Sequence, residues 1–264
     1  MNKTGEEPIL SLPERHNRIL ALLQQFGSIS VAQLAERFKV SEVTIRKDLS
    51  YLEQQKKLYR THGSAILISP YISDRHVNEK AKRNVAEKRA IGAFAASLIA
   101  QDDSIIIASG TTVTFLAREI NPAGHLTAIT ASVPVTQILS QCPDVDVIQL
   151  GGITRSSSVS VVGPFAEQML RSFNCSKLFI GVDGIDTEFG LTTTNMLEAS
   201  LNGAMIDAAQ KVIVLADSSK FGRRGFSKIC DLESVDRIIT DSGVQSVYLD
   251  RLRERGIEVT VVDV

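Results

Sequence analysis

The sequence has few of the residues that build extracellular or membrane scaffolds. Its 264 residues include no tryptophan, three cysteines and only 5% aromatic residues. An odd number of widely spaced cysteines argues against a disulfide framework or a zinc cluster, and no segment reaches the roughly 18 consecutive apolar residues of a membrane span. The N-terminus also lacks the charged and then apolar pattern of a signal peptide. We therefore expect a cytoplasmic protein that uses no metal and no cofactor and does not insert into a membrane.

The net charge of −1 conceals a basic front and an acidic body. Residues 1–90 hold 16 Lys and Arg and 10 Asp and Glu, a net charge of +6, whereas residues 91–264 hold 13 and 20, a net charge of −7. A basic segment attracts polyanions such as DNA. An uneven surface charge with no binding partner is the alternative, so the charge favours nucleic-acid binding by the front segment without establishing it.

Three short helical patterns follow one another in the first sixty residues. The first runs over Ser11–Phe26, and the second starts at the predicted N-cap Ser30, which has a capping partner, Gln33, three residues later. A tight turn leads to a third predicted N-cap, Ser41. Such a helical triplet is typical of small DNA-binding modules, but a protein-interaction module with a solvated charged face would show the same pattern.

The third helical pattern, residues 41–55, has two unlike faces. Ile45, Leu49 and Leu52 share an apolar face that is expected to pack on the first two helices. The opposite face carries hydroxyl and cationic groups of the kind that contact base edges and phosphates in the major groove. Two short β-like stretches around His62-Gly63 then predict a wing beside the DNA backbone. The predicted DNA-binding residues are Ser30, Ser41, Thr44, Arg46, Lys47, Arg60 and His62.

The order of residues in this segment matches a known signature. Arg15, Ile19 and Leu23 are followed by the run from Ser41 to Leu49, and the wing has His-Gly-Ser-Ala at residues 62–65. Residues 12–67 thereby resemble the helix-turn-helix of the DeoR family of bacterial transcription regulators, whose wing usually has His-Gly-Gly-Ala. The resemblance implies an α+β winged helix-turn-helix domain over residues 12–67, with the helix-turn-helix at about 29–48, that binds a double-stranded DNA operator.

The rest of the chain predicts a second domain of another class. Residues 68–90 are polar and basic and indicate a linker that becomes helical toward its end. In residues 91–264, buried apolar runs alternate with helical stretches, which predicts an α/β domain with a largely parallel sheet covered on both faces. The predicted strands are Ser104–Ala108, Leu126–Thr130, Val145–Leu150, Lys177–Gly181, Lys211–Ala216, Arg237–Thr240 and Glu258–Val262.

Polar clusters follow several of these strands. Ligands of parallel sheets bind at the carboxyl ends of the strands. Ser109–Thr112 precedes a helix, as a phosphate cradle does, and Lys220 is a natural counter-charge to a phosphate. Helix caps and turns would explain each cluster singly. The predicted effector-binding residues are Ser109, Gly110, Thr111, Thr112, Thr130, Ser132, Asp183, Gly184, Asn195, Glu198 and Lys220.

Three segments that contain some of these polar residues also resemble the sensor domain of the DeoR family. They are GVDGID at 181–186, NMLEA at 195–199 and LADSSKFG at 215–222. The resemblance implies a fold shared with ribose-5-phosphate isomerase and a phosphorylated sugar or polyol as the effector. It places the phosphate at Gly110–Thr112 and Lys220, and the sugar hydroxyls near Asp183, Asn195 and Glu198.

Three positions depart from the family pattern. Ala108 stands where the family usually has Asp, Ala131 where it has Asn, and Asn202-Gly203 where it has a basic pair. A lost partner for a buried polar ligand group costs about 1–3 kcal/mol. Two or three such losses would weaken binding by roughly 10²-fold. The departures therefore predict either a different ligand or weaker binding.

The function predicted from the sequence is that of a DNA-binding transcription regulator and not an enzyme. We expect a repressor of sugar or polyol metabolism genes that a phosphorylated sugar-like effector controls, acting as a homodimer or homotetramer because one module makes too few contacts for specific binding. One alternative is a sugar-phosphate isomerase or deaminase fused to a DNA-binding module, with acid–base groups among Asp183, Asp186, Glu198 and Lys220. Another is an architectural DNA binder with a dimerising domain.

Overall fold

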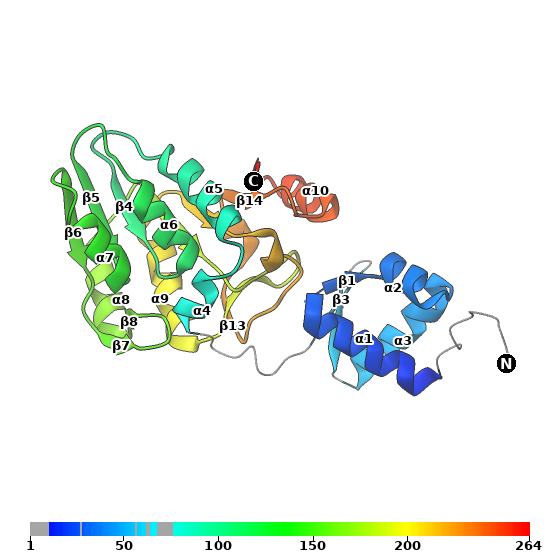
Figure 1. Ribbon diagram of the computed structural model, residues 1–264. Helices are drawn as coiled ribbons and strands as arrows, with labels where there is room; N and C mark the ends of the chain where they lie inside the picture. The colour runs from blue at the N-terminus through cyan, green and yellow to red at the C-terminus, as the bar shows by residue number, and fades with distance from the viewer. Residues whose placement is uncertain (1–10, 27, 56, 62–63, 68–75) are drawn as a thin grey trace. The chain divides into compact units, whose positions relative to one another are not determined.

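The chain forms two compact units, residues 1–70 and 71–264 (Figure 1). The structure is a computed structural model that describes residues 11–26, 28–55, 57–61, 64–67 and 76–264. Within these residues, every helix is too short or too polar to pass through a bilayer.

The first unit combines three helices with a small antiparallel sheet. The sheet has the strand order β1-β3-β2, so the hairpin of β2 and β3 forms the predicted wing. The pairing of β1 with β3 was not predicted, because the three residues of β1 are too few for their alternation of polar and apolar side chains to indicate a strand. The elements are α1 (Leu12–Phe26), β1 (Ser28–Ser30), α2 (Val31–Phe38), α3 (Glu42–Gln54), β2 (Leu58–Thr61) and β3 (Ser64–Leu67).

Local capping explains where α2 and α3 begin. The Ser30 hydroxyl accepts a hydrogen bond from the Gln33 backbone N–H at 3.1 Å, and the Gln33 side chain accepts one from the Ser30 N–H at 3.0 Å, which confirms the predicted capping box. Lys39, with φ +52°, ends α2 in the left-handed conformation. The Ser41 hydroxyl then accepts from the Thr44 N–H at 3.2 Å and caps α3. The turn between the two helices is therefore fixed at both ends.

A buried ion pair joins α1 to the back of α3. The Asp48 carboxylate is only 3% exposed and accepts hydrogen bonds from Arg15 Nε at 2.6 Å and Arg15 Nη2 at 3.1 Å. His16 Nε2 lies 3.1 Å from the same carboxylate. The predicted apolar residues Ile45 and Leu49 flank this pair in the core. Together these contacts fix the rotation of α3 and leave its other face in solvent.

The second unit is built on a seven-stranded sheet in which every neighbouring pair is parallel. The strand order is β15-β14-β12-β9-β4-β5-β6. All seven predicted strands are confirmed, each within one residue at either end. They are β4 (Ser104–Ile107), β5 (Leu126–Thr130), β6 (Val145–Gln149), β9 (Lys177–Gly181), β12 (Val212–Leu215), β14 (Arg237–Asp241) and β15 (Glu258–Val262).

Helices and short antiparallel strands complete the second unit. The helices are α4 (Val77–Ala81), α5 (Val85–Ala96), α6 (Thr111–Glu119), α7 (Val133–Leu139), α8 (Pro164–Leu170), α9 (Met196–Asp207) and α10 (Ser246–Glu254). The short strands are β7 (Ile153–Arg155), β8 (Ser160–Val162), β10 (Gly184–Asp186), β11 (Gly190–Thr193) and β13 (Ser227–Cys230), which the sequence analysis did not predict. The 3-10 turns are η1 (Ser218–Lys220) and η2 (Leu232–Ser234).

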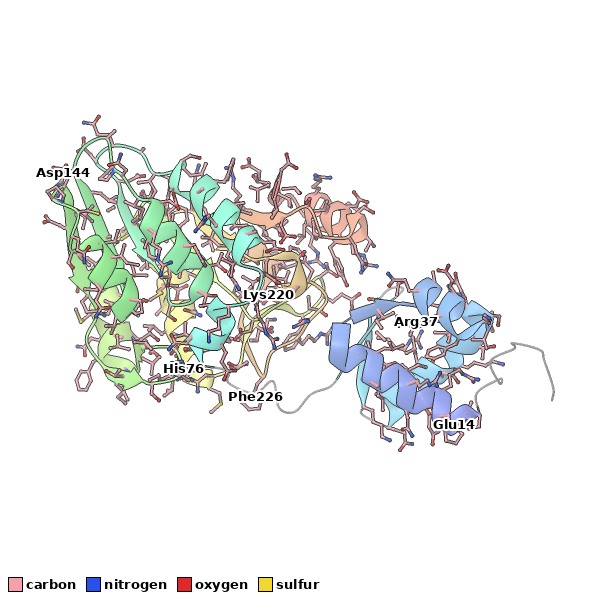
Figure 2. All side chains as sticks on the ribbon, in the orientation of Figure 1. Glu14, Arg37, His76, Asp144, Lys220 and Phe226 are labelled. Atoms are coloured by element: carbon pink, nitrogen blue, oxygen red, sulfur yellow. The ribbon has the colours of Figure 1, made fainter. Side chains whose placement is uncertain are left out.

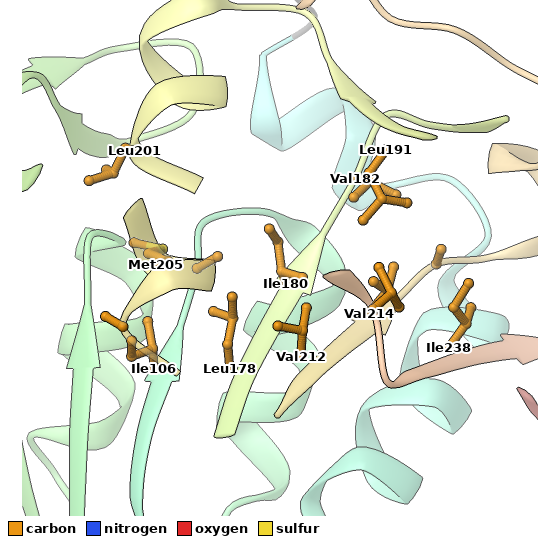
Figure 3. Close-up of a cluster of buried hydrophobic side chains, with 14 of the residues drawn as sticks. Ile106, Leu178, Ile180, Val182, Leu191, Leu201, Met205, Val212, Val214 and Ile238 are labelled. Carbon is orange, nitrogen blue, oxygen red and sulfur yellow. The ribbon is translucent and has the colours of Figure 1, made fainter. Parts of the chain in front are cut away.

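Alternate residues of each buried strand face two separate cores. Ile105 and Ile107 of β4 pack with residues of α5, α6 and α7, whereas Ile106 between them packs in the core that contains Leu201 and Met205 of α9. Figure 3 shows this second core, with side chains of the central strands gathered beneath α9. The period of two is the geometry of a pleated strand. Helices therefore cover both faces of the sheet, as the continuous apolar runs predicted.

The sheet changes winding direction between β4 and β9. From β4 the chain winds through α6 and α7 to β5 and β6 on one side, whereas β9, β12, β14 and β15 follow on the other side. A crevice forms outside the carboxyl ends of the strands at such a switch point. The segments that follow β4 and β9, and β12 beside them, therefore meet at one place.

Loss of the Asp48 carboxylate is expected to destabilise the first unit. Asp48→Ala leaves the Arg15 guanidinium buried without its partner, at a cost of about 3–5 kcal/mol. Amide hydrogen exchange of α3 in the full chain measures this change. Glu42→Ala is the control, because its ion pair with Arg46 is solvent-exposed and contributes about 1 kcal/mol or less. Equal exchange rates in the two variants would contradict a structural role for Asp48.

Candidate DNA-contacting helix and effector cavity

The solvent face of α3 carries the predicted DNA-contacting groups. Ser41, Arg46 and Lys47 are exposed, and Thr44 is half-buried. Arg46 Nη2 lies 2.7 Å from Glu42 Oε2, one helical turn away, and both side chains are about half exposed. An exposed pair of this kind is weak and opens easily, so the guanidinium is available to a base edge.

The wing is joined directly to this helix. Arg60 on β2 donates from Nη1 to the Ser50 hydroxyl at 2.5 Å and from its backbone N–H to Glu53 Oε1 at 2.9 Å. These bonds hold the first strand of the wing against α3. The remaining predicted wing residue, His62, lies outside the described residues. Ser30 is engaged in its capping box at the start of α2.

Two apolar side chains on α3 were not predicted to be exposed. Val43 is 58% and Tyr51 51% exposed, and both border a shallow groove with Arg46, Lys47 and Ser50. A valine methyl group at the start of such a helix is suited to contact a thymine methyl group. Val43 lies on the side of the helix opposite the buried Ile45. The helical periodicity of the sequence could therefore have predicted its exposure.

A polar cavity lies at the switch point of the sheet in the second unit. Its volume is about 70 Å³. The segments that line it are α4, the loop after β4 with the start of α6, the end of β9 with the loop after it, the loop before β8, β11, α9 and η1. The lining residues are Val77, Lys80, Ser109, Gly110, Thr111, Thr112, Ser157, Ser158, Gly181, Val182, Asp183, Thr193, Glu198, Asn202 and Lys220.

One part of the cavity is suited to an anion. Gly110, with φ +132°, precedes α6 and offers no side chain to cap it. The first amide in the helical ladder is that of Thr114, which donates to Gly110 O at 3.2 Å, so the N–H groups of residues 111–113 have no acceptor within the helix. Free N–H groups and the helix dipole together attract negative charge.

Lys220 adds a cation to this anion-binding part. It lies in η1, shortly after β12, and its side chain is labelled in Figure 2. Burial lowers the pKa of Lys220, and the nearby carboxylates of Asp183 and Asp217 oppose part of that shift. A phosphate beside Lys220 would stabilise the charged ammonium in the same way.

Another part of the cavity holds an ion pair. Asp183 accepts a hydrogen bond from Lys80 Nζ at 2.8 Å, and from the hydroxyls of Thr193 at 3.2 Å and Thr194 at 3.3 Å. Burial raises the pKa of Asp183, but the charges of Lys80 and Lys220 and these hydrogen bonds outweigh it and leave the pKa below its ordinary value. The Asp183 side chain is therefore an ionised carboxylate that is already neutralised by Lys80.

A second ion pair lies beside the first. Arg155 Nη1 is 3.2 Å from Glu198 Oε1, and Arg155 Nη2 donates to the Ser157 hydroxyl at 2.7 Å. The Thr193 hydroxyl lies between the two carboxylates, 3.4 Å from Glu198 Oε2. Both carboxylates of the cavity are thus paired with cations from other segments of the chain.

Helix α4 is anchored to the cavity wall by several groups. The Val77 N–H donates to Ser157 O at 2.7 Å, and Lys88 Nζ, which is buried, donates to Lys80 O at 2.9 Å and to Arg83 O. Burial lowers the pKa of Lys88. The Asn84 amide, between α4 and α5, donates to Asp217 Oδ1 at 2.8 Å. Residues of the segment predicted as a linker therefore pack on the effector cavity.

Seven of the eleven predicted effector residues line the cavity, and four do not. The Thr130 hydroxyl donates to Ile107 O at 2.6 Å, Ser132 caps α7 and Asn195 caps α9. Gly184 is buried in β10, where an added Cβ would lie 2.4 Å from Arg223 O. A part for these four in effector binding stays a prediction. The seven that line the cavity are Ser109, Gly110, Thr111, Thr112, Asp183, Glu198 and Lys220.

The structure also brings in residues that the sequence analysis did not select. Lys80 and Thr193 line the cavity, but the pairing of Lys80 with Asp183 joins positions 103 residues apart and leaves no local signal. Of the three departures from the family pattern, Ala108 and Ala131 are buried in the core, where they offer no polar group. Asn202 instead presents an amide to the cavity, so this departure is an exchange of polar groups and not a loss.

Comparison with known proteins covers both units. Residues 15–71 match the model of the DeoR-like helix-turn-helix domain, and residues 83–242 match that of the DeoR C terminal sensor domain. Relatives include the uncharacterized HTH-type transcriptional regulator YulB of Bacillus subtilis, 38% identical over 94% of this chain and 96% of YulB. The HTH-type transcriptional repressor GlcR of the same organism is 34% identical over 95% and 96%.

A further relative and a solved structure complete the comparison. The lactose phosphotransferase system repressor of Streptococcus mutans is 36% identical over 86% of this chain and 91% of the repressor. The ribose 5-phosphate isomerase A structure from Methanocaldococcus jannaschii is 16% identical, covers 52% of this chain and 55% of the isomerase, and has a TM-score of 0.38. A likeness that slight has no bearing on the fold or the function.

Removal of the Lys80 ammonium is expected to lower stability in a pH-dependent way. The pKa of Asp183 is depressed in the folded chain, so the carboxylate stabilises the fold above its unfolded pKa of about 3.9 and this contribution is lost as the pH falls through the folded pKa. Lys80→Met should therefore lower the melting temperature at pH 7, and the deficit should shrink as the pH falls below about 4.

The matched control is Lys82→Met, which removes an exposed lysine one position beyond α4. The Lys80 side chain is 30% exposed, so solvent screens the pair and the loss at neutral pH is about 1 kcal/mol. A deficit that stays constant from pH 7 to pH 3 would show that the ion pair does not stabilise the fold.

Proposed function

Because the chain belongs to the DeoR family of transcription regulators, we propose that it is a repressor of sugar or polyol metabolism genes whose operator binding a phosphorylated sugar or polyol controls. The observation that carries this proposal is the cavity at the switch point of the sheet, where the start of α6 and Lys220 meet. The family and the relatives named above are regulators, so the chain is not assigned as an isomerase or deaminase.

The first unit supplies the DNA contacts. Its helix α3 is held from behind by Asp48 and presents Arg46 and Lys47 to solvent. Arginine forms bidentate hydrogen bonds to guanine, whereas lysine and the wing cation Arg60 are suited to phosphates. We assign base contacts to Arg46 and Thr44, and backbone contacts to Ser30, Ser41, Lys47, Arg60 and His62.

The second unit supplies the effector contacts. The phosphate lies against Gly110–Thr112 with Lys220 as its counter-charge, and the sugar hydroxyls lie near Asp183 and Glu198. Support comes from the free N–H groups of the first turn of α6 and from the cation beside them. Both features favour an anion in the same cavity.

Entry of the effector requires movement of α4. A cavity of about 70 Å³ is far below the roughly 300–1,000 Å³ of pockets that hold small ligands. Lys80 and Val77 of α4 occupy part of its wall, and α4 begins seven residues after Pro70, the last residue of the first unit. Displacement of Lys80 from Asp183 would change how α4 continues into the connecting segment. This shift in population is the proposed link between effector and operator.

The repressor acts as a homodimer or homotetramer in the cytoplasm. One winged module makes few base contacts, and specific binding at physiological salt requires at least two half-sites. A change in the spacing of two modules then weakens both contacts at once. The nature of the partner supports this cellular site, since a transcription regulator has to reach its operator DNA.

Arg46→Ala is expected to abolish the preference for operator DNA. Each bidentate contact to a base pair contributes about 1–3 kcal/mol of discrimination, so the ratio of specific to random binding should fall by roughly tenfold or more. Lys47→Ala should weaken both kinds of binding and reduce the salt slope by about 1. Fluorescence anisotropy on duplexes from the protein's own promoter and on random duplexes measures both quantities.

The control for this experiment is Arg253→Ala, which removes an exposed arginine of the second unit. It should leave both affinities unchanged. If Arg46→Ala retains the full preference for the promoter duplex, α3 is not the helix that contacts the bases.

Lys220→Met is expected to abolish stabilisation by phosphorylated sugars. A ligand at 100 times its dissociation constant stabilises a protein by about 2.7 kcal/mol, which raises the melting temperature. Loss of this half-buried cation should weaken phosphate binding by roughly tenfold or more. The measurement is a thermal-shift series with sugar and polyol monophosphates, in which each variant is compared with its own ligand-free melting temperature.

Lys211→Met, which removes an exposed lysine before β12, is the matched control and should respond as the unmodified chain does. If no phosphorylated sugar or polyol stabilises the unmodified chain, the effector assignment is wrong.

A further inference from the structure

Asn202 is a buried amide that faces the effector cavity. It lies on α9 one helical turn after Glu198, so the two side chains are neighbours on one face of the helix. The residue is only 8% exposed and lines the cavity. Among the described residues, its amide makes no side-chain hydrogen bond, and its atoms are not among the fully buried ones that lack a partner, so the amide is open to the cavity. An amide in this position is available to donate to or accept from a group that enters the cavity.

The surroundings of Asn202 restrict the chemistry of that partner. The carboxylates of Glu198 and Asp183 lie in the same part of the cavity, joined through the Thr193 hydroxyl, and are paired with Arg155 and Lys80. A second phosphate or a carboxylate placed there would meet two negative charges whose cations are already engaged. An uncharged hydroxyl or amide group can instead donate to a carboxylate and pair with the Asn202 amide, which both donates and accepts.

The cavity offers two kinds of polar group, and Lys220 and Asp183 lie close enough to influence each other's pKa. The start of α6 and Lys220 favour one anionic group, whereas the Asp183, Glu198 and Asn202 side chains favour neutral polar groups. The Asn202 amide is therefore placed to contact a polar group of a ligand in the cavity.

We infer that Asn202 determines effector specificity by hydrogen-bonding an uncharged polar group at the end of the effector away from its phosphate. The effector is thus a sugar or polyol that carries a single phosphate and no second anionic group. This inference rests on the proposed function, because it takes the cavity as the effector site.

The test compares Asn202→Leu with Ser200→Ala, an exposed position on the same helix that lies outside the cavity. The probes are inorganic phosphate, the monophosphates glycerol 3-phosphate, ribose 5-phosphate and fructose 6-phosphate, and the bisphosphate fructose 1,6-bisphosphate. Calorimetric titration of the full chain gives each affinity. Asn202→Leu should lower the affinity for the monophosphate that binds the unmodified chain by about tenfold. It should leave the affinity for inorganic phosphate unchanged.

A melting curve without ligand separates recognition from a structural role. Asn202→Leu should leave the melting temperature unchanged or raise it, because the amide makes no side-chain hydrogen bond within the described residues that the substitution would remove. A structural asparagine would lower it. Asn202→Asp, which keeps the shape and adds a negative charge beside Glu198, should also weaken the monophosphate and serves if the leucine variant does not fold.

Two results would overturn the inference and leave the proposed function intact. One is a monophosphate that binds the leucine and aspartate variants as tightly as the unmodified chain. The other is fructose 1,6-bisphosphate binding the unmodified chain as tightly as any monophosphate in the series. If neither inorganic phosphate nor any phosphorylated probe binds the unmodified chain, the proposed effector site itself fails, and the inference fails with it.

Discussion

The parallel register of β12, β9 and β4 is the constraint on which the effector site depends. Because the three strands are neighbours and run the same way, the segments that follow them leave the sheet at one edge. These segments carry Lys220, Asp183 and Gly110. Gly110 and Lys220 are more than a hundred positions apart in the sequence. Interactions between sequence neighbours therefore cannot bring these residues together. The strand order therefore determines which polar groups line the cavity. Side chains of α9 and α4 form the rest of its lining.

The sequence predicted features that depend on residues close together in the chain and missed features that depend on residues far apart. The seven parallel strands were predicted because burial on both faces produces continuous apolar runs such as Ile105–Ile107. The caps Ser30 and Ser41 were predicted because a cap acts over three residues. The short strands β10 and β11 were not, since three or four residues carry no clear alternation. Lys80 was placed in a solvated linker, because nothing near it in the chain shows that it pairs with Asp183. Proximity to strand ends suggested Thr130 and Ser132, whose hydroxyls bond to backbone groups, and their part in effector binding stays a prediction.

In the first unit, too, the sequence predicted what depends on neighbouring residues and missed a contact between distant ones. Helical periodicity predicted which side chains of α3 point inward, and Ile45, Leu49 and Leu52 are all buried. Periodicity alone did not show that Asp48 is buried as well, since its pairing with Arg15 depends on the packing of α1 against α3. A charged residue on the buried side of a helix was recognisable only as part of the family signature. Its physical role is to orient α3, whose other face we propose as the DNA-contacting one.

The charges of the cavity favour binding over catalysis. A general base is most effective when its pKa is near the working pH. The pKa of Asp183 is instead held below its ordinary value by Lys80 and Lys220, so the group stays ionised and is engaged with a cation from α4. A carboxylate that stays ionised and paired with Lys80 of α4 is a weak proton acceptor, so this arrangement does not favour acid–base catalysis. The same ion pair that makes Asp183 a poor base also joins α4 to the cavity wall, and this contact is the one on which the proposed control by an effector depends.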